Sequence, residues 1–104
     1  MPFSADNPKE ASQEKINRII HAPARLIIVK LLYVLDAADM VFLKRESQLS
    51  WGNLSVQIKK LEEVGYVDIK KEFVENKPHT LVSLTMDGRK AFDEYRWNLI
   101  EFLG

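Results

Sequence analysis

Apolar residues recur at helical spacing near the start of the chain. The first apolar stripe consists of Ile16, Ile19 and Ile20. Ser12 precedes this stripe, and serine is a favoured N-cap residue, so the pattern predicts a helix over residues 12–20. Residues 1–11 contain two prolines and show little apolar periodicity. We therefore expect them to form a flexible N-terminal arm.

A denser apolar run occupies residues 23–35. Pro23 suits the first turn of a helix, because that position needs no backbone N–H donor. Apolar side chains then cover most of the helical circumference, a pattern typical of a helix that is buried on nearly all sides. Residues 36–39 have an aspartate at each end, and we expect them to be a short connection.

Two further helical segments follow, separated by a tight turn. Residues 40–47 predict a short helix with Leu43 facing inward. Residues 51–64 predict a second helix, which begins after Ser50 as N-cap and ends before Gly65. The apolar face of this second helix consists of Leu54, Ile58 and Leu61. Two helices with so short a connection indicate a helix-turn-helix.

The period of the apolar pattern changes to two after the second of these helices. Residues 66–74 predict a strand, residues 75–78 a polar turn, and residues 79–84 a returning strand. Together, residues 66–84 predict a β-hairpin. A hairpin that directly follows a helix-turn-helix has the position of a wing.

Thr85 can cap a final helix over residues 86–103. This helix carries more large apolar side chains than one small domain can cover, so we expect it to pair with a second copy of the chain, helped by residues 12–20. The expected dimer interface comprises Ile16, Ile19, Ile20, Phe92, Tyr95, Leu99, Phe102 and Leu103. The element order predicts an α+β fold: a single winged helix-turn-helix domain over residues 12–104, with a hairpin wing and a C-terminal dimerisation helix.

Composition narrows the possible functions. The chain has no cysteine and two histidines, His21 and His79, and it shows no catalytic motif, so we expect neither an enzyme nor a cofactor or metal site. No apolar run is long enough to span a membrane, and the N-terminus does not resemble a signal peptide, which indicates a cytoplasmic protein. Fifteen Lys+Arg balance fifteen Asp+Glu. A surface that binds nucleic acid would therefore need its lysines gathered on one face.

The outward face of the predicted helix 51–64 carries side chains that can contact DNA. Asparagine and glutamine can form paired hydrogen bonds to adenine, valine can touch a thymine methyl group, and lysine can pair with phosphate. The candidates on this helix are Gly52, Asn53, Ser55, Val56, Gln57, Lys59 and Lys60. Further contacts are expected from Lys44 and Arg45 in the preceding helix and from Asn76, Lys77 and His79 in the hairpin. An ordinary solvated helix face would show a similar pattern.

Several segments resemble the small prokaryotic winged-helix regulators related to the MarR and ArsR groups. The matching segments are His21-x-Pro23-x-Arg25, Asp39-Met40-x-x-Leu43, Gly52-Asn53-Leu54-Ser55-x-x-Ile58-x-x-Leu61-Glu62-x-x-Gly65-Tyr66-Val67 and Leu84-Thr85-x-x-Gly88-Arg89. The resemblance implies a homodimeric regulator that binds double-stranded DNA at a palindromic operator. It also implies a small aromatic effector near the dimer junction, where Tyr95 and Trp97 could line a cleft. The balanced charge keeps an alternative open, a winged helix that binds another protein instead of DNA.

Overall fold

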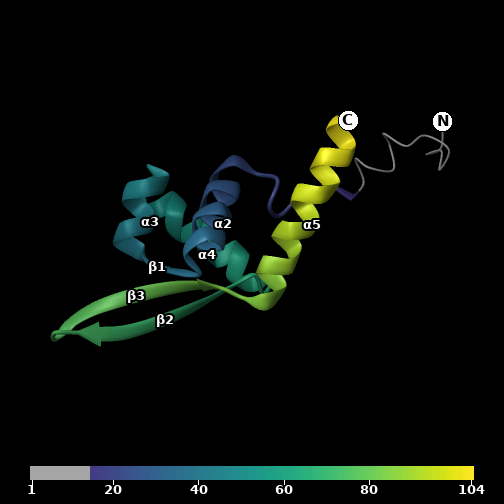
Figure 1. The fold of residues 1–104 in the computed structure, drawn as a ribbon. Helices are drawn as coiled ribbons and strands as arrows, with labels where there is room; N and C mark the ends of the chain where they lie inside the picture. Colours follow the sequence, from purple (N-terminus) through teal and green to yellow (C-terminus); the bar gives the residue numbers. More distant parts are fainter. Residues whose placement is uncertain (1–14) are drawn as a thin grey trace.

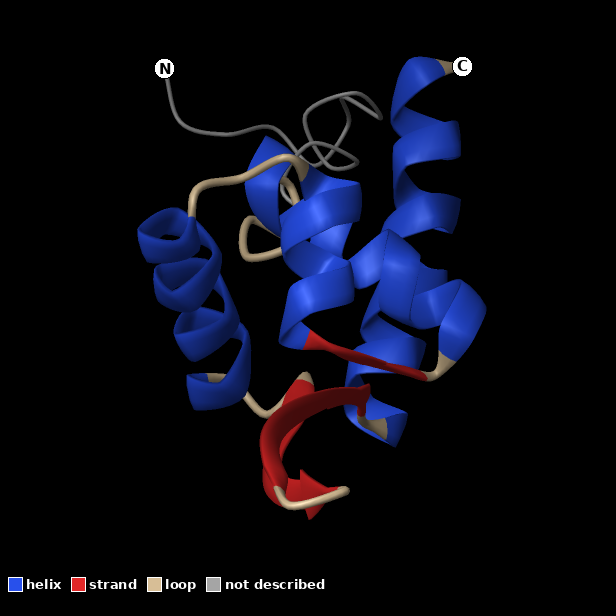
Figure 2. Ribbon diagram, turned by 90° about the vertical axis from the view of Figure 1, so that its left-hand side faces the viewer, coloured by secondary structure: helices blue, strands red, loops and turns tan. Residues whose placement is uncertain are grey.

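The computed structural model describes residues 15–104. Its elements are α2 (Pro23–Leu35), β1 (Ala37–Asp39), α3 (Met40–Ser47), α4 (Trp51–Glu63), β2 (Val67–Val74), β3 (Lys77–Leu84) and α5 (Met86–Leu103). The strands form one antiparallel sheet in the order β1-β3-β2. The helices lie together on one side, and the β2–β3 hairpin extends away from them (Figures 1 and 2). This arrangement confirms the predicted α+β winged helix-turn-helix.

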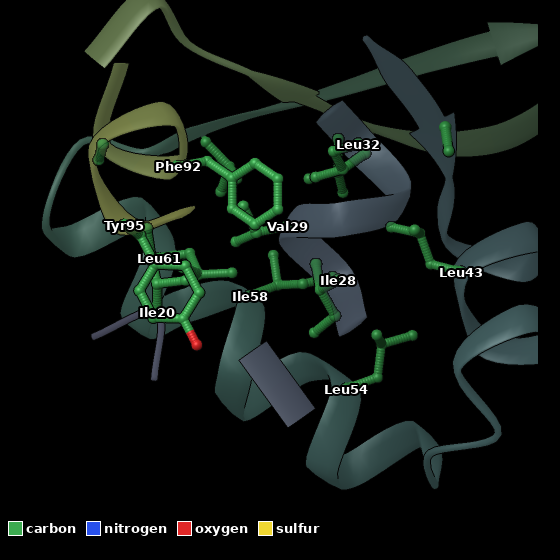
Figure 3. Packing of buried hydrophobic residues seen from close by; sticks show 14 residues of the cluster. Ile20, Ile28, Val29, Leu32, Leu43, Leu54, Ile58, Leu61, Phe92 and Tyr95 are labelled. Carbon is green, nitrogen blue, oxygen red and sulfur yellow. The ribbon is translucent and has the colours of Figure 1, made fainter. Parts of the chain in front are cut away.

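The core lies between α2 and the helices around it. Ile28, Val29 and Leu32 of α2 are fully buried, and α2 packs against α3, α4 and α5. Figure 3 shows Ile28 and Val29 pointing toward Ile58 of α4, whereas Leu32 points toward Phe92 of α5. The predicted apolar face of α4 is confirmed: Leu54, Ile58 and Leu61 are all buried. Burying one such side chain contributes about 1.5–3 kcal/mol, so this face fixes α4 firmly on the body.

Side-chain caps begin three of the helices. Ser50 accepts a hydrogen bond from the Asn53 N–H at 3.1 Å, and Thr85 accepts one from the Gly88 N–H at 2.9 Å, as predicted. Asp39 caps α3 in the same way. Each cap satisfies a backbone donor that the helix itself cannot pair, which is typically worth about 1 kcal/mol. The cap at Ser50 therefore starts α4 directly after the short connection 48–50, as a helix-turn-helix requires.

Two expectations for residues 23–39 are wrong. The helix α2 is not buried on nearly all sides, because Ile27, Val34 and Leu35 remain exposed. The segment after it is not an irregular connection, since Ala37–Asp39 form β1, which pairs with Leu81–Ser83 of β3. A three-residue strand is too short to show a period of two, and only the neighbouring strand makes it regular.

The helix predicted over residues 12–20 is also corrected. Of its described residues only Lys15 is helical, and residues 16–22 form bends and turns. The Asn17 side chain explains the interruption, because its Oδ1 accepts hydrogen bonds from the N–H groups of Ile19 and Ile20 at 2.9 and 3.1 Å. Such a local turn competes with the helix for the same donors. The predicted arm 1–11 and residues 12–14 lie outside the described residues.

The returning strand of the hairpin is longer, and the turn is tighter, than expected. The connection consists of Glu75 and Asn76 alone, both at positive φ (53° and 64°), and Lys77 and Pro78 already belong to β3. Positive φ at both central residues is the conformation of a type I′ turn, whose twist matches that of the two strands. Pro78 is accommodated because β1 covers only the far part of β3.

The start of α5 is packed closely against the segment that leaves α4. Thr85 donates a hydrogen bond from its Oγ1 to the Gly65 carbonyl at 2.6 Å, and its N–H bonds the Tyr66 carbonyl. A Cβ atom at Gly88 would lie 2.2 Å from that Tyr66 oxygen. Only glycine therefore fits at position 88, where the first turn of α5 crosses the Tyr66 backbone. This close contact fixes the start of α5.

Three residues expected at the dimer interface lie instead in the core of a single chain. Ile20, Phe92 and Tyr95 are at most 7% exposed, and the Phe92 ring packs 4.9 Å from the Tyr33 ring between centroids. The interface prediction is corrected for these three, because the first half of α5 covers its own domain. Of the remaining candidates, Ile16, Ile19, Leu99 and Phe102 are half-buried and Leu103 is exposed. Within residues 15–104 no helix is both long and apolar enough to cross a membrane.

Candidate nucleic-acid interface

The outer face of α4 is polar and accessible. Its apolar face is held in the core, so the opposite side of the helix points to solvent. The predicted contact residues Gly52, Asn53, Ser55, Val56, Lys59 and Lys60 are all exposed, and Gln57 is half-buried at the edge. Nothing lies within 4 Å of a Cβ built at Gly52, so the first turn of α4 is open. A surface of this kind can enter a groove of DNA without any change in the fold.

A chain of hydrogen bonds links this face to the body of the domain. Arg25 of α2 donates from Nη1 to Gln57 Oε1 at 2.8 Å, and Gln57 donates from Nε2 to Asn53 Oδ1 at 2.9 Å. Arg25 also donates to the backbone carbonyls of Ile19 and Arg18. The spacing of Asn53 and Gln57 along the helix is visible in the sequence. The role of Arg25 is not, because 32 residues separate it from Gln57.

The cations near α4 differ in how they are paired. Lys59 forms an ion pair with Glu62 (3.9 Å), and Arg45 forms one with Glu46 (3.7 Å). Both pairs are exposed to solvent and hence weak. The Lys44 ammonium lies over the Trp51 ring, 5.9 Å from its centroid, at the junction of α3 and α4. Lys60, Lys71 and Lys77 form no ion pair with any residue of the range 15–104, which leaves their charges available to phosphate.

The β2–β3 hairpin carries the second group of predicted contacts. Asn76 lies in the turn and Lys77 directly after it, at the end farthest from the helices (Figure 1). His79 lies farther back, paired across the strands with Glu72. Phe73 was missed by the sequence argument, although its side chain is 77% exposed near the tip. The hairpin thus presents an amide, a lysine and an aromatic ring together.

A second feature lies between residues 16–21 and the end of α5. A hollow of about 190 Å³ is lined by Ile16, Arg18, His21, Leu99 and Phe102. Trp97 does not line it and is 65% exposed. Tyr95 lies behind it, with its hydroxyl 2.9 Å from His21 Nδ1, and burial raises the pKa of Tyr95 above its ordinary value. The hollow is apolar with two basic groups at its edge.

No cluster of metal ligands is found within the part of the chain that the structure describes. Residues 15–104 contain no group of three His, Asp or Glu side chains placed to share a metal ion.

The sequence matches a family of DNA-binding domains, and the fold matches that of a transcriptional regulator homologue. Residues 24–103 match the family described as winged helix DNA-binding domain. The chain is 34% identical to the uncharacterized protein MJ0432 of Methanocaldococcus jannaschii, over 81% of this chain and 91% of that protein. A transcriptional regulator homologue from Pyrococcus horikoshii has the same fold, with a TM-score of 0.84, 25% identity and coverage of 89% of this chain and 94% of that one.

More distant structures share the fold alone. NadR, solved in complex with 4-hydroxyphenylacetate, superposes with a TM-score of 0.66 and 21% identity over 100% of this chain and 87% of its own. A MarR-family transcriptional regulator from Silicibacter pomeroyi superposes with a TM-score of 0.64 and 17% identity over 91% and 63%. The expected relation to MarR-type regulators is confirmed at the level of fold, which is that of regulators and not of enzymes. The match over residues 24–103 shows that this chain belongs to the winged helix DNA-binding domain family.

Proposed function

We propose that this protein is a transcriptional regulator that binds specific double-stranded DNA as a homodimer. In this proposal α4 enters the major groove, and the β2–β3 hairpin contacts the minor groove or the backbone beside it. The observation that carries the proposal is the exposed polar face of α4, held rigidly by a fully buried apolar face. The adjoining hairpin, with an accessible lysine at its tip, distinguishes this face from that of an ordinary solvated helix.

The dimensions of α4 suit a major groove. Its thirteen residues span about 20 Å, and an α-helix fits the width of the groove. The open first turn at Gly52 exposes backbone N–H groups that favour a phosphate. Lys59 and Lys60 follow along the helix and would pair with the phosphates on either side of the groove. Base contacts then fall to Asn53, Ser55 and Val56.

The second half of α5 supports the dimer. Trp97, Ile100 and Leu103 are 60–70% exposed, and Leu99 and Phe102 are only half-buried. This end of the helix extends beyond the body of the domain (Figure 1). Covering it with the same helix of a second copy would bury these side chains and create a symmetric pair. Two copies of α4 would then face adjacent turns of the DNA, as a palindromic operator requires.

Selection of duplexes from a random DNA pool tests the proposal. We expect an enriched sequence with two inverted half-sites about ten base pairs apart, centre to centre. Asn53→Ala should weaken binding to the enriched duplex by about tenfold, because it removes one hydrogen-bonding group that faces a base, while leaving non-specific binding unchanged. An equivalent change on the exposed side of α5, Lys90→Ala, serves as control. Failure to enrich or retard any duplex at low salt would favour the protein-binding alternative.

We also propose that the hollow beside α5 binds a small aromatic acid that regulates DNA binding. Leu99 and Phe102 supply apolar walls, and Arg18 and His21 supply donors for a carboxylate. NadR, which shares the fold, was solved with 4-hydroxyphenylacetate. Thermal denaturation with a panel of aromatic acids tests this. At least one acid should raise the melting temperature, and Arg18→Ala, which removes a donor outside the proposed dimer interface, should abolish that increase. Equal melting temperatures with every acid would contradict the proposal.

A further inference from the structure

The hydrogen-bond chain from Arg25 to Asn53 has a direction. A guanidinium group only donates hydrogen bonds, whereas an amide side chain has one end that donates and one that accepts. Arg25 must therefore face the oxygen of Gln57, and its Nη1 lies 2.8 Å from that Oε1 atom. With its oxygen turned to Arg25, Gln57 offers its Nε2 group to Asn53 Oδ1 at 2.9 Å. The arginine thus fixes the orientation of both amides.

Arg25 is itself held in place. Its Nε donates to the Ile19 carbonyl at 2.5 Å, and its Nη2 lies 3.5 Å from the Arg18 carbonyl. Both acceptors belong to the bent segment that precedes α2. The guanidinium therefore cannot turn away from Gln57 without losing bonds on its other side. This anchoring makes the direction of the chain a property of the folded domain.

At the exposed end of this hydrogen-bond chain, Asn53 presents a hydrogen-bond donor in a fixed orientation. Asn53 is exposed on the outer face of α4, and its Oδ1 is engaged by Gln57. The Nδ2 group, with two N–H bonds, is the end left to face a partner. Gln57 has its oxygen on Arg25 and its nitrogen on Asn53, so it is poorly placed to contact a base. The expectation that both amides make paired contacts to adenine does not fit this geometry.

We propose that Arg25 and Gln57 are positioning residues that make Asn53 a hydrogen-bond donor toward DNA. The inference rests on the proposed function. In the major groove, guanine presents two acceptors, N7 and O6, and thymine presents O4, while cytosine presents only a donor. Adenine presents the N6 donor beside its N7 acceptor, and a paired contact to both would need the Asn53 oxygen, which is turned toward Gln57. At the base contacted by Asn53, the protein should therefore prefer guanine or thymine over cytosine or adenine.

The substitution Gln57→Glu reverses the chain in a defined way. A carboxylate only accepts, so one oxygen keeps the bond to Arg25 and the other must receive a donor from Asn53. Asn53 would rotate its amide, place Nδ2 toward position 57 and turn Oδ1 outward. At the one base pair that Asn53 contacts, we expect the preference to shift at least tenfold toward cytosine or adenine. Preferences at the other positions of the selected site should stay unchanged.

A charge-matched control separates this effect from simple repulsion. Ser55→Glu adds the same charge to the exposed face of α4 but lies outside the hydrogen-bond chain. Because Ser55 faces a different base in the proposed complex, this variant should weaken binding but leave the preference at the base pair that Asn53 contacts unchanged. A third variant, Gln57→Leu, breaks the chain and should relax the preference without reversing it. If Gln57→Glu and Ser55→Glu had the same preference at the base pair that Asn53 contacts, the inference would be overturned.

A measurement without DNA keeps the inference testable if the proposed function fails. In the protein as it stands, the side-chain NH₂ of Gln57 should exchange with solvent more slowly than that of Asn53 when followed by NMR. In Gln57→Glu, the Asn53 NH₂ should become the protected one, with a shifted nitrogen resonance. Unchanged exchange at Asn53 in this variant would show that the amide is not oriented by the chain, whatever the protein binds. Absence of any DNA selection by the unmodified protein would instead count against the proposed function alone.

Discussion

The helices α4 and α5 use apolar residues in different ways. In α4 the large apolar side chains Leu54, Ile58 and Leu61 face the core, and the opposite side is mainly polar. In α5 the side chains of Ala91, Phe92 and Tyr95 in the first half are buried, but Trp97 and Leu103 in the second half are 65% and 70% exposed. A polar outer face is stable in water and can exchange one polar partner for another. An apolar outer face is stable only when it is covered.

This difference supports the two kinds of contact that we propose for one small domain. The face of α4 suits a reversible contact with a charged polymer, whose strength depends on salt. The end of α5 suits a lasting contact with another apolar surface, as in an obligate homodimer. Pairs of matched substitutions can separate the two roles, provided that only one member of each pair disturbs the feature under test.

The largest effect is expected where α5 joins the body. Gly88→Ala places a methyl group 2.2 Å from the Tyr66 carbonyl oxygen, so α5 must move away from the core. We expect a loss of about 3 kcal/mol in the free energy of unfolding, at the upper end for an overpacked site. Urea denaturation followed by circular dichroism measures it.

The matched change in α4 should have the opposite sign. Gly52→Ala meets open space and replaces a helical glycine, so it should stabilise the domain by about 0.5–1 kcal/mol. A similar loss of stability in both variants would show that the crossing at Tyr66 is not what demands glycine at position 88.

A smaller effect is expected at the end of α5. Leu103→Asp puts a charge on the surface that we propose a second copy covers, and each dimer carries it twice. We expect the dimer dissociation constant to rise about 30-fold, or about 2 kcal/mol, measured by analytical ultracentrifugation. Met86→Asp is a suitable control, because Met86 is even more exposed but lies at the other end of the helix. Equal dissociation constants for the two variants would place the interface elsewhere.

The contribution of a single lysine on α4 should be smaller again. Lys60→Gln leaves one phosphate per chain without its cation, and we expect affinity for the selected duplex to fall about fivefold, or about 1 kcal/mol. The slope of log affinity against log salt should fall by about one for each phosphate that is no longer neutralised. Lys90→Gln changes the net charge equally but lies on α5, and it should leave the slope nearly unchanged. Identical slopes for the two variants would mean that only total charge matters.

The sequence predicts α4 and the hairpin well because their patterns are local. The spacing of Leu54, Ile58 and Leu61, together with a cap at Ser50, is enough to place a helix and its faces. The sequence predicts local structure poorly where contact with a residue far away in the chain decides the conformation. The strand β1 is regular only because β3 lies beside it, and Arg25 orients Gln57 only because the fold brings them together.

The closing helix shows a different limit of sequence reasoning. A stripe of apolar residues at heptad spacing predicts that something covers it, but not what does so. In α5 the same stripe first covers the domain's own core, at Phe92 and Tyr95, and then continues past it to Phe102. The helix predicted over residues 12–20 shows the same limit, because the side chain of Asn17 alone forms a local turn that interrupts it.

The smallest effect tests how well the first half of α5 seals the core. Burial raises the pKa of Tyr95, so the folded protein keeps the hydroxyl proton at pH values where the unfolded chain, with a tyrosine pKa of about 10, has begun to lose it. The free energy of unfolding should therefore be unaffected by this group below about pH 10 and should fall as the pH rises from there toward the raised value. Tyr95→Phe removes the hydrogen bond to His21, which should cost about 1 kcal/mol or less at neutral pH. Because phenylalanine has no proton to release, its stability should fall less steeply above about pH 10. Urea denaturation of both proteins between about pH 8 and pH 11 gives the slope of the unfolding free energy against pH for each. Parallel curves would mean that solvent reaches Tyr95. In that case this half of α5 is no better sealed than the other.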